Sequence, residues 1–265
     1  MRKSLLAIAL MMLSPLLDSH EFWLEPLRFQ YKVGDAIRVR FRVGENFEGD
    51  NWTGNRSSVE QLKLFYKSVD DDLVSLLPDS ARGDSLTLQF FDEGTMMIAY
   101  ESRNKYIRLP ADSFLMYLRE DGLQNAIDYR AEHGETDSAG KEYYRRSVKT
   151  IFQVGAAKDN LHSKRTGLPL DIIPQAHPYS LKTGQELPVK ILFKGAPLKG
   201  ALVKAWHRLN GKTTSTDLRT DAEGQVSIPV SLAGRWMLST VRMEREPRDS
   251  AQWQSYWGSL TWGYE

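Results

Sequence analysis

The sequence predicts a mostly β protein made of two β-sandwich-like domains, the first with a helical insertion, behind a cleaved leader. Three observations predict this class. Short apolar segments alternate with period two, turn signals rich in Gly, Asn and Pro separate them, and one stretch near residues 110–133 has helical spacing. The chain has 265 residues and no cysteine. It is long enough for two ordinary domains, whose cores must hold without disulfides.

Residues 1–19 have the features of a secretion signal. Met1-Arg2-Lys3 supplies positive charge, and residues 4–17 form an apolar run shorter than the ~20 residues that a membrane span needs. Ser19 suits the last position before the cut. We predict cleavage after Ser19 and a periplasmic or secreted mature chain that starts at His20. No second apolar stretch reaches spanning length, so no membrane span is expected in the mature chain.

The charge balance excludes one class of partner. Removing Arg2, Lys3 and Asp18 with the leader from 35 basic and 34 acidic residues leaves 33 of each. A mature chain with no net charge presents no basic face for nucleic acid, so we expect no nucleic-acid partner.

The first domain is predicted to span residues 20–155. Residues 36–43 alternate apolar and charged side chains, as in a half-buried strand. Further strands are expected at residues 29–33, 59–69 and 148–154, and a hairpin at residues 86–91 and 96–101. Residues 111–130 space their apolar side chains as a helix, which Gly122 divides in two.

Residues 156–167 have no apolar period and are predicted to be a linker. The second domain, residues 168–265, is predicted to be a seven-strand antiparallel sandwich. Its strands are expected at residues 168–173, 186–193, 201–207, 213–220, 225–229, 235–244 and 255–262.

The predicted cut has a chemical consequence. It would give His20 a free α-amino nitrogen, which can chelate one metal ion together with the imidazole of the same residue. A second histidine would complete a three-nitrogen set that suits copper or nickel. The amine has an ordinary pKa of ~7.7–8.0, so a metal displaces its proton easily near neutral pH. The alternative is an uncommitted, frayed chain end.

Three other residues compete as further ligands. His177 lies in a proline-bounded turn, and His207 ends a predicted strand. On that strand His207 falls on the core side, where a histidine is more often a buried residue with satisfied hydrogen bonds than a ligand. Met243 is an outside candidate as a soft ligand. His133 and His162 lie in polar stretches and are expected to be exposed.

No catalytic residues are predicted. The sequence lacks a Gly-x-Ser-x-Gly elbow, a phosphate-binding glycine loop and a His-Glu-x-x-His motif. The protein is therefore expected to bind rather than to catalyse. Aromatic residues near the C-terminus could form a sugar-binding platform or pack in the core. They are Trp253, Tyr256, Trp257, Trp262 and Tyr264.

Four stretches together resemble a known family. His20-Glu-Phe-Trp-Leu-Glu-Pro26 is similar to the mature start of a periplasmic domain-of-unknown-function family associated with nickel and cobalt uptake. The other similar stretches are residues 142–150, 219–226 and 234–243. The second half also resembles the transthyretin-like or carboxypeptidase-regulatory sandwich class. Members commonly have Asn at the position of His177, and many have His at that of Arg242.

The resemblance implies nickel or cobalt as the cargo, a membrane metal transporter as partner, and His20 as a ligand. With the residue chemistry, it predicts an extracytoplasmic nickel, cobalt or copper binding protein for metal uptake or handling. A carbohydrate-binding or protein-interaction module without a metal role is the alternative. A third hypothesis is a copper oxidase that acts on polysaccharide through its N-terminal histidine.

Overall fold

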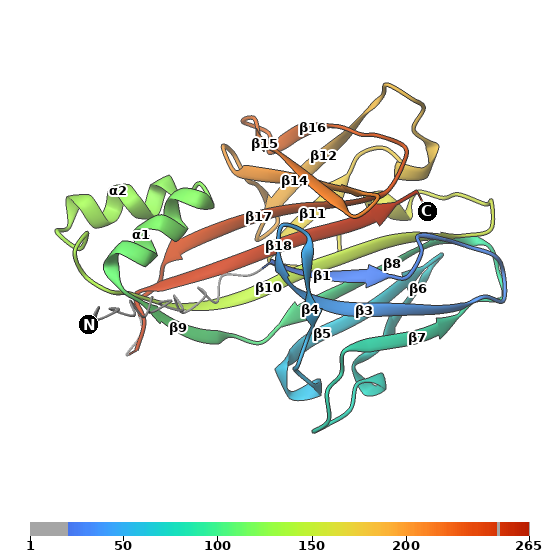
Figure 1. The fold of residues 1–265 in the computed structure, drawn as a ribbon, viewed down its shortest axis with the longest axis horizontal. Helices are drawn as coiled ribbons and strands as arrows, with labels where there is room; N and C mark the ends of the chain where they lie inside the picture. Colours follow the sequence, from blue (N-terminus) through green and yellow to red (C-terminus); the bar gives the residue numbers. More distant parts are fainter. Residues whose placement is uncertain (1–20, 248–249, 265) are drawn as a thin grey trace, which may run out of the picture.

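The computed structural model describes residues 21–247 and 250–264 (Figure 1). The predicted leader and His20 lie outside the described residues. The mostly β prediction is confirmed, since the described chain forms eighteen strands in three sheets, two α-helices and four short 3-10 helices. Neither helix in this described part has the length and apolar character that crossing a membrane would require.

The first half contains ten strands and both α-helices. Their bounds are β1 (Glu21–Pro26), β2 (Gln30–Tyr31), β3 (Ala36–Glu45), β4 (Glu48–Asn51), β5 (Val59–Tyr66), β6 (Val69–Asp72), β7 (Ser85–Gln89), β8 (Gly94–Ser102), β9 (Lys105–Leu109), α1 (Ala111–Glu120), α2 (Gln124–Glu132) and β10 (Gly140–Val154). The strand predicted at residues 36–43 and the helix divided at Gly122 are both confirmed.

The second half contains eight strands, close to the seven predicted ranges. They are β11 (Leu170–Pro174), β12 (Glu186–Phe193), β13 (Ala196–Pro197), β14 (Leu202–Leu209), β15 (Lys212–Arg219), β16 (Gln225–Pro229), β17 (Arg235–Arg245) and β18 (Trp253–Gly263).

The three sheets form three layers. The middle layer is a ten-stranded sheet, β15-β14-β17-β18-β10-β8-β5-β6, with β2 and β9 also paired to β10. On β8, Met96 and Ile98 belong to the core beneath the sheet of β1, β3, β4 and β7, whereas Met97 and Ala99 belong to the core beneath the sheet of β11, β12, β13 and β16. Alternate residues of a strand point to opposite faces, so the two outer sheets cover opposite faces of the middle sheet.

The hairpin predicted from residues 86–91 and 96–101 is wrong. Strand β7 pairs with β3 in an outer sheet, while β8 pairs with β5 and β10 in the middle sheet. The physical reason is that β8 buries both faces, with every residue from Gly94 to Ser102 buried. A strand of this kind belongs in the middle of the molecule, whereas a hairpin partner of β7 would lie in an outer layer.

Strands β10 and β18 join the two halves of the chain. They pair in parallel from Glu142 with Trp253 to Thr150 with Thr261. One continuous sheet therefore runs through both predicted domains, and its long strands β10, β17 and β18 lie side by side in Figure 1. Separate folding of residues 20–155 and 168–265 stays a prediction.

The segment between those ranges makes contacts of its own. Within residues 156–167, Leu161 and His162 begin a short 3-10 helix and are both buried. The expectation that His162 is exposed is therefore wrong, because this turn packs between the middle sheet and the sheet of β11. His133 is exposed as expected and stacks on Tyr129, with ring centroids 3.8 Å apart.

The two helices cover one end of the middle sheet (Figure 1). Phe114 and Leu118 of α1 pack with Val241 and Met243 of β17, on the face that also carries the sheet of β1. Gly122 between the helices has φ +66°, and a Cβ there would lie 2.8 Å from Leu202. Glycine suits both the positive φ and the close approach of the helices to β14.

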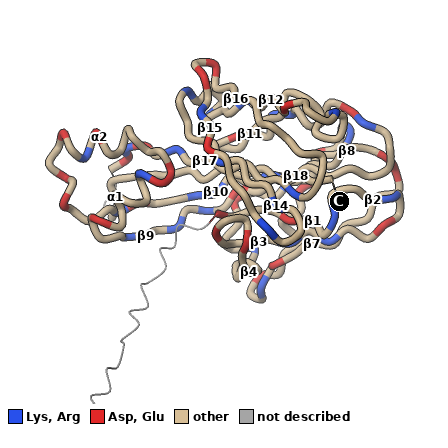
Figure 2. The backbone as a smooth tube through the Cα atoms, turned by 45° about the horizontal axis from the view of Figure 1, so that its top comes forward, with Lys and Arg blue, Asp and Glu red and all other residues tan. Residues whose placement is uncertain are grey.

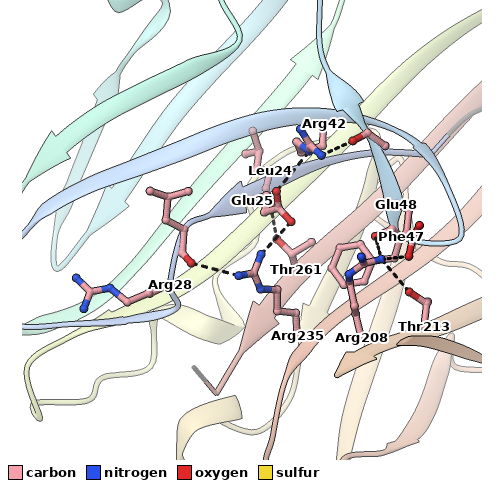
Figure 3. A network of polar contacts seen from close by, with 12 residues as sticks. Leu24, Glu25, Arg28, Arg42, Phe47, Glu48, Arg208, Thr213, Arg235 and Thr261 are labelled. Carbon is pink, nitrogen blue, oxygen red and sulfur yellow. Dashed lines mark hydrogen bonds and ion pairs between the residues drawn. The ribbon is translucent and has the colours of Figure 1, made fainter. Parts of the chain in front are cut away.

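Polar contacts hold β1 against its neighbour β3 and against the middle sheet (Figure 3). Glu25 forms ion pairs with Arg42 of β3 at 3.4 Å and with Arg235 of β17 at 3.1 Å. The Thr261 hydroxyl donates to the carbonyl oxygen of Leu24 at 2.6 Å. These contacts hold the second half of β1, a few residues after the predicted start of the mature chain, in one position on the fold.

Candidate functional site

His177 is buried and both of its ring nitrogens form hydrogen bonds. Nδ1 accepts the backbone N–H of Tyr179 at 3.2 Å, and Nε2 lies 2.9 Å from the hydroxyl of Thr95. The ring also contacts His162, with centroids 4.9 Å apart. Burial lowers the pKa of His177 to about 4, so the ring is neutral near pH 7. Its environment is that of a hydrogen-bonded core histidine.

His207 lies on β14, with its ring stacked on Trp236 at 4.3 Å between centroids. Its Nε2 is 2.8 Å from the carbonyl oxygen of Ala233 and therefore carries the proton. Val203 and Ala205, on the same face of β14, belong to the core beneath the sheet of β11. His207 is thus on the core side, as predicted.

The structure does not bring the candidate ligands together. His177 lies in the turn before a 3-10 helix, His207 lies near the Ala233 turn, and Met243 is fully buried beneath the helices. His20 lies outside the described residues. Within residues 21–247 and 250–264, no group of three or more His, Cys, Asp or Glu side chains could hold a metal ion.

A large cavity opens where β1 starts. It has a volume of about 1020 Å³ and lies between the start of β1, the β3–β4 turn, α1 and strands β14 and β15. We call it the N-terminal cavity. Its lining residues are Glu21, Glu45, Asn46, Met116, Tyr117, Arg119, Glu120, Asp121, Leu202, Lys204, Trp206, Ser215, Asp217, Leu218, Arg219 and Trp257.

The cavity is acidic and has aromatic walls. Five carboxylates line it against three basic side chains, whereas over the rest of the chain the two signs are interspersed (Figure 2). Lys204 pairs with Asp121 at 3.0 Å. Burial raises the pKa of Glu21 to about 7, and burial also raises the pKa of Asp121. Tyr117 and Trp257 stack with centroids 5.5 Å apart.

A buried carboxyl group, Glu142, lies behind the cavity wall. Its Oε1 accepts hydrogen bonds from Ser255 at 3.0 Å and from Tyr117 at 3.4 Å, while its Oε2 is buried without a partner. Burial raises the pKa of Glu142 to about 8, although the hydrogen bonds from Ser255 and Tyr117 act in the opposite direction. The native protein therefore holds this group protonated near pH 7.

We expect Glu142→Gln to flatten the pH dependence of stability. Between the ordinary pKa of 4.5 and the native value of about 8, the unfolded chain has lost a proton that the native chain keeps. Rising pH therefore destabilises the parent protein across this window, by up to about 5 kcal/mol at ~1.4 kcal/mol per pH unit. The amide oxygen still accepts from Ser255 and Tyr117 without ionising. Urea unfolding at pH 5, 7 and 9 should show the variant gaining stability relative to the parent as pH rises. Parallel profiles for the two proteins would contradict the expectation.

The C-terminal aromatic residues do not form an open platform. Trp253, Tyr256 and Trp262 are buried, and Trp262 stacks on Trp236 with centroids 5.9 Å apart. Trp206 is also buried, because Trp23 and Phe47 from the first half of the chain cover it. Sugar binding would be favoured by aromatic rings aligned on an exposed face. These described C-terminal residues show no such alignment.

Sequence analysis did not detect the N-terminal cavity. Glu21, Asp121 and Asp217 are far apart in the chain and belong to no motif. One signal could have pointed to it: Lys204 and Trp206 alternate with Val203, Ala205 and His207, so β14 has a second face that another part of the chain must cover.

Comparison with solved structures gives only remote likenesses. The D0-D1 domain of intimin is 12% identical, with 92% of this chain and 97% of that chain covered and a TM-score of 0.21. A Salmonella alpha-2-macroglobulin variant is 10% identical, with 92% and 15% covered and a TM-score of 0.24. A chimeric titin Z1Z2 tandem is 12% identical, with 91% and 97% covered and a TM-score of 0.20. Likenesses this weak carry no argument about function.

Comparison of sequences is more decisive. No curated protein matches this chain. The model of one family, described as Domain of unknown function (DUF4198), matches residues 17–244. Because that match spans most of the chain and nearly all of the three-layer fold, the protein belongs to the DUF4198 family.

Proposed function

We propose that this protein binds a transition-metal cation, nickel, cobalt or copper, outside the cytoplasm, and that the metal site lies at the N-terminal cavity. The observation that carries the proposal is the position of Glu21. It is the first residue of β1, it lines the cavity, and it directly follows His20 in the chain. Consecutive Cα atoms are ~3.8 Å apart, so a mature chain that starts at His20 has its amino group near this acidic cavity.

The donor set combines two kinds of ligand. His20 supplies the α-amino nitrogen and an imidazole nitrogen as a chelate, as nickel and copper favour. The cavity supplies carboxylate oxygens, of which Glu21 is the nearest in the chain. Within residues 21–247 and 250–264, no group of three or more His, Cys, Asp or Glu side chains could hold a metal ion, so the proposed site depends on His20 and on the predicted cut. This arrangement replaces the second histidine expected from the sequence, since His177 forms hydrogen bonds through both ring nitrogens.

Binding of a cation has an electrostatic basis at this place. The carboxylates outnumber the basic side chains of the cavity, and Lys204 is paired with Asp121. A divalent cation is attracted by the remaining carboxylates. The concave, acidic lining concentrates that attraction at the cavity.

The first test uses the secreted mature protein. Mass spectrometry should find His20 at its N-terminus, and calorimetric titration with nickel and copper should then show one saturable site. His20→Ala keeps the amine but removes the imidazole, and we expect it to weaken binding on the order of 100-fold, or about 2.8 kcal/mol. Adding one Ala before His20 keeps the imidazole but moves the amine, and should weaken binding similarly.

Two further variants separate this site from other histidines. His133→Ala changes an exposed histidine on α2's C-terminal side and should leave the affinity unchanged. Glu21→Gln should weaken binding roughly tenfold if its carboxylate is a ligand. Unchanged affinity in His20→Ala, or a mature chain that starts elsewhere, would refute the proposal.

A further inference from the structure

A second cleft lies on the opposite face of the middle sheet. Two adjoining cavities of about 340 and 470 Å³ share Lys194 and Tyr256 as lining residues. On β18, Tyr256 faces this cleft while the next residue, Trp257, faces the N-terminal cavity, as alternate residues of a strand do. At β18, the middle sheet therefore separates this cleft from the N-terminal cavity.

The floor of this cleft is a row of three side chains on neighbouring strands. Tyr256 of β18 is the register partner of Arg145 on β10 and of Arg242 on β17. Register partners point to the same face, and strands lie ~4.8 Å apart, so the two arginine Cα atoms flank the tyrosine about 10 Å from each other. The next row on this face, with Gly258 in the middle, is already covered by Leu170 of β11. The cleft thus begins where the outer sheet ends.

Basic side chains from two other segments, and one from the end of β17 itself, also line the cleft. Arg165 comes from the loop before β11, Lys194 from the β12–β13 turn, and Arg245 from the end of β17. Lys194 lies over Tyr256, 5.2 Å from the ring centroid, and pairs with Glu244 at 2.6 Å. Arg245 pairs with Glu135 at 2.8 Å. We call this group, with Arg145 and Arg242, the arginine cleft.

Two of these guanidinium groups have no acid partner. Arg145, Lys194 and Arg245 each form an ion pair. The side chains of Arg165 and Arg242 form no hydrogen bond or ion pair with any described residue, and the Arg242 guanidinium lies 5.9 Å from the centroid of the Phe193 ring. The Nε atom of Arg242 is buried without a partner, as is that of Arg145. A buried donor left without an acceptor costs free energy that an incoming acceptor recovers.

The geometry points to an oxyanion site in the arginine cleft, in which Arg165 and Arg242, which line the two adjoining cavities on either side of Lys194 and Tyr256, bind the phosphate or carboxylate groups of a small ligand. Guanidinium groups bind such groups through paired, charge-assisted hydrogen bonds. Three acids line the cleft, and none of them is free: Asp171 pairs with the buried Lys149, Glu244 pairs with Lys194, and Glu246 has an interaction of its own.

The test is titration of the purified chain with inorganic phosphate and, separately, with citrate, followed by calorimetry and intrinsic fluorescence. We expect one saturable site for at least one of the two anions, weakened by added NaCl, and the stronger of the two identifies the phosphate or the carboxylate class. Arg165→Gln with Arg242→Gln should lower the affinity tenfold or more, since two charge-assisted bonds are lost.

Single variants and a matched control keep the test decisive. Arg165 is exposed, so Arg165→Gln alone should fold normally and still weaken binding if the double variant is unstable. Arg82→Gln removes another exposed arginine, in the loop before β7, and should not change the affinity. No saturable binding of phosphate or citrate, or equal affinity in the parent and the double variant, would overturn the inference.

Discussion

Asp171→Ala is expected to lower the free energy of unfolding by about 3–5 kcal/mol, the range found when one partner of a buried ion pair is removed. Asp171 of β11 accepts a hydrogen bond from Lys149 of β10, and their side chains are only 4% and 1% exposed. The second carboxylate oxygen of Asp171 accepts the backbone N–H of Thr166 at 2.9 Å. The variant would leave the Lys149 ammonium group buried between two sheets without its counter-charge.

The loss should depend on pH in a defined direction. Burial lowers the pKa of Lys149 even with Asp171 in place. Without Asp171 the native state favours the neutral amine still more strongly, whereas the unfolded chain keeps its proton up to the ordinary value near 10.5. The unfolded state then binds more protons, so the stability of the variant rises with pH. Urea unfolding should show a smaller deficit at pH 9.5 than at pH 7.

An exposed pair supplies the control for this variant. Lys164 and Asp70 lie 2.7 Å apart with side chains 32% and 49% exposed, so Asp70→Ala should change stability by no more than about 0.5–1 kcal/mol. The double variant Lys149→Met with Asp171→Leu removes both charges and should recover most of the loss. Equal effects of Asp171→Ala and Asp70→Ala would contradict this account of the buried pair.

Trp23→Ala is expected to cost about 3–5 kcal/mol, as for other buried aromatic residues truncated to alanine. Trp23 of β1 is 1% exposed and packs with Phe47, Trp206 and Met237. Its ring centroid lies 5.4 Å from that of Phe47, in an edge-to-face arrangement. This cluster contains residues from both halves of the chain and lies beside the N-terminal cavity, so the variant should also reduce metal binding.

Two comparisons isolate the packing effect of Trp23. Its indole N–H is buried without a hydrogen-bond partner, so Trp23→Phe loses volume but no hydrogen bond and should cost only about 1–2 kcal/mol. Phe91→Ala truncates an aromatic side chain that is 75% exposed and should stay within about 0.5 kcal/mol of the parent. Thermal and urea unfolding of the three variants should give this order. A cost for Trp23→Ala below 1 kcal/mol would show that the cluster adds little to stability.

Local pattern predicted many elements of the fold because burial on one face leaves a period in the sequence. The alternation of residues 36–43 became β3, and residues 186–193 became β12 with the same bounds. The helical spacing near Gly122 became α1 and α2. The hairpin prediction failed at β8, where Met96 to Tyr100 are all apolar. A strand covered on both faces has no alternation, so its partners cannot be deduced from the pattern.

The features of the candidate site also fall into those that local sequence predicts and those that depend on tertiary packing. The leader, the cut after Ser19 and the special chemistry of His20 follow from consecutive residues, so they could be predicted, and they stay predictions. The expected partners His177 and His207 were predicted from residue type and local position, a proline-bounded turn and the end of a strand. Their hydrogen bonds to Tyr179, Thr95 and Ala233 depend on which turns pack together, and this information is not local.

By itself, the sequence determined that this is a mostly β chain with a helical insertion, and it predicted a leader followed by a distinctive histidine. Only the tertiary structure decided that both outer sheets share one middle sheet, that acidic residues meet at Glu21, and that Arg145, Tyr256 and Arg242 form a row. The physical reason is the distance along the chain over which each kind of information acts. Periodicity records how much of each side chain is buried along one strand, whereas register between strands distant in the chain decides which side chains become neighbours.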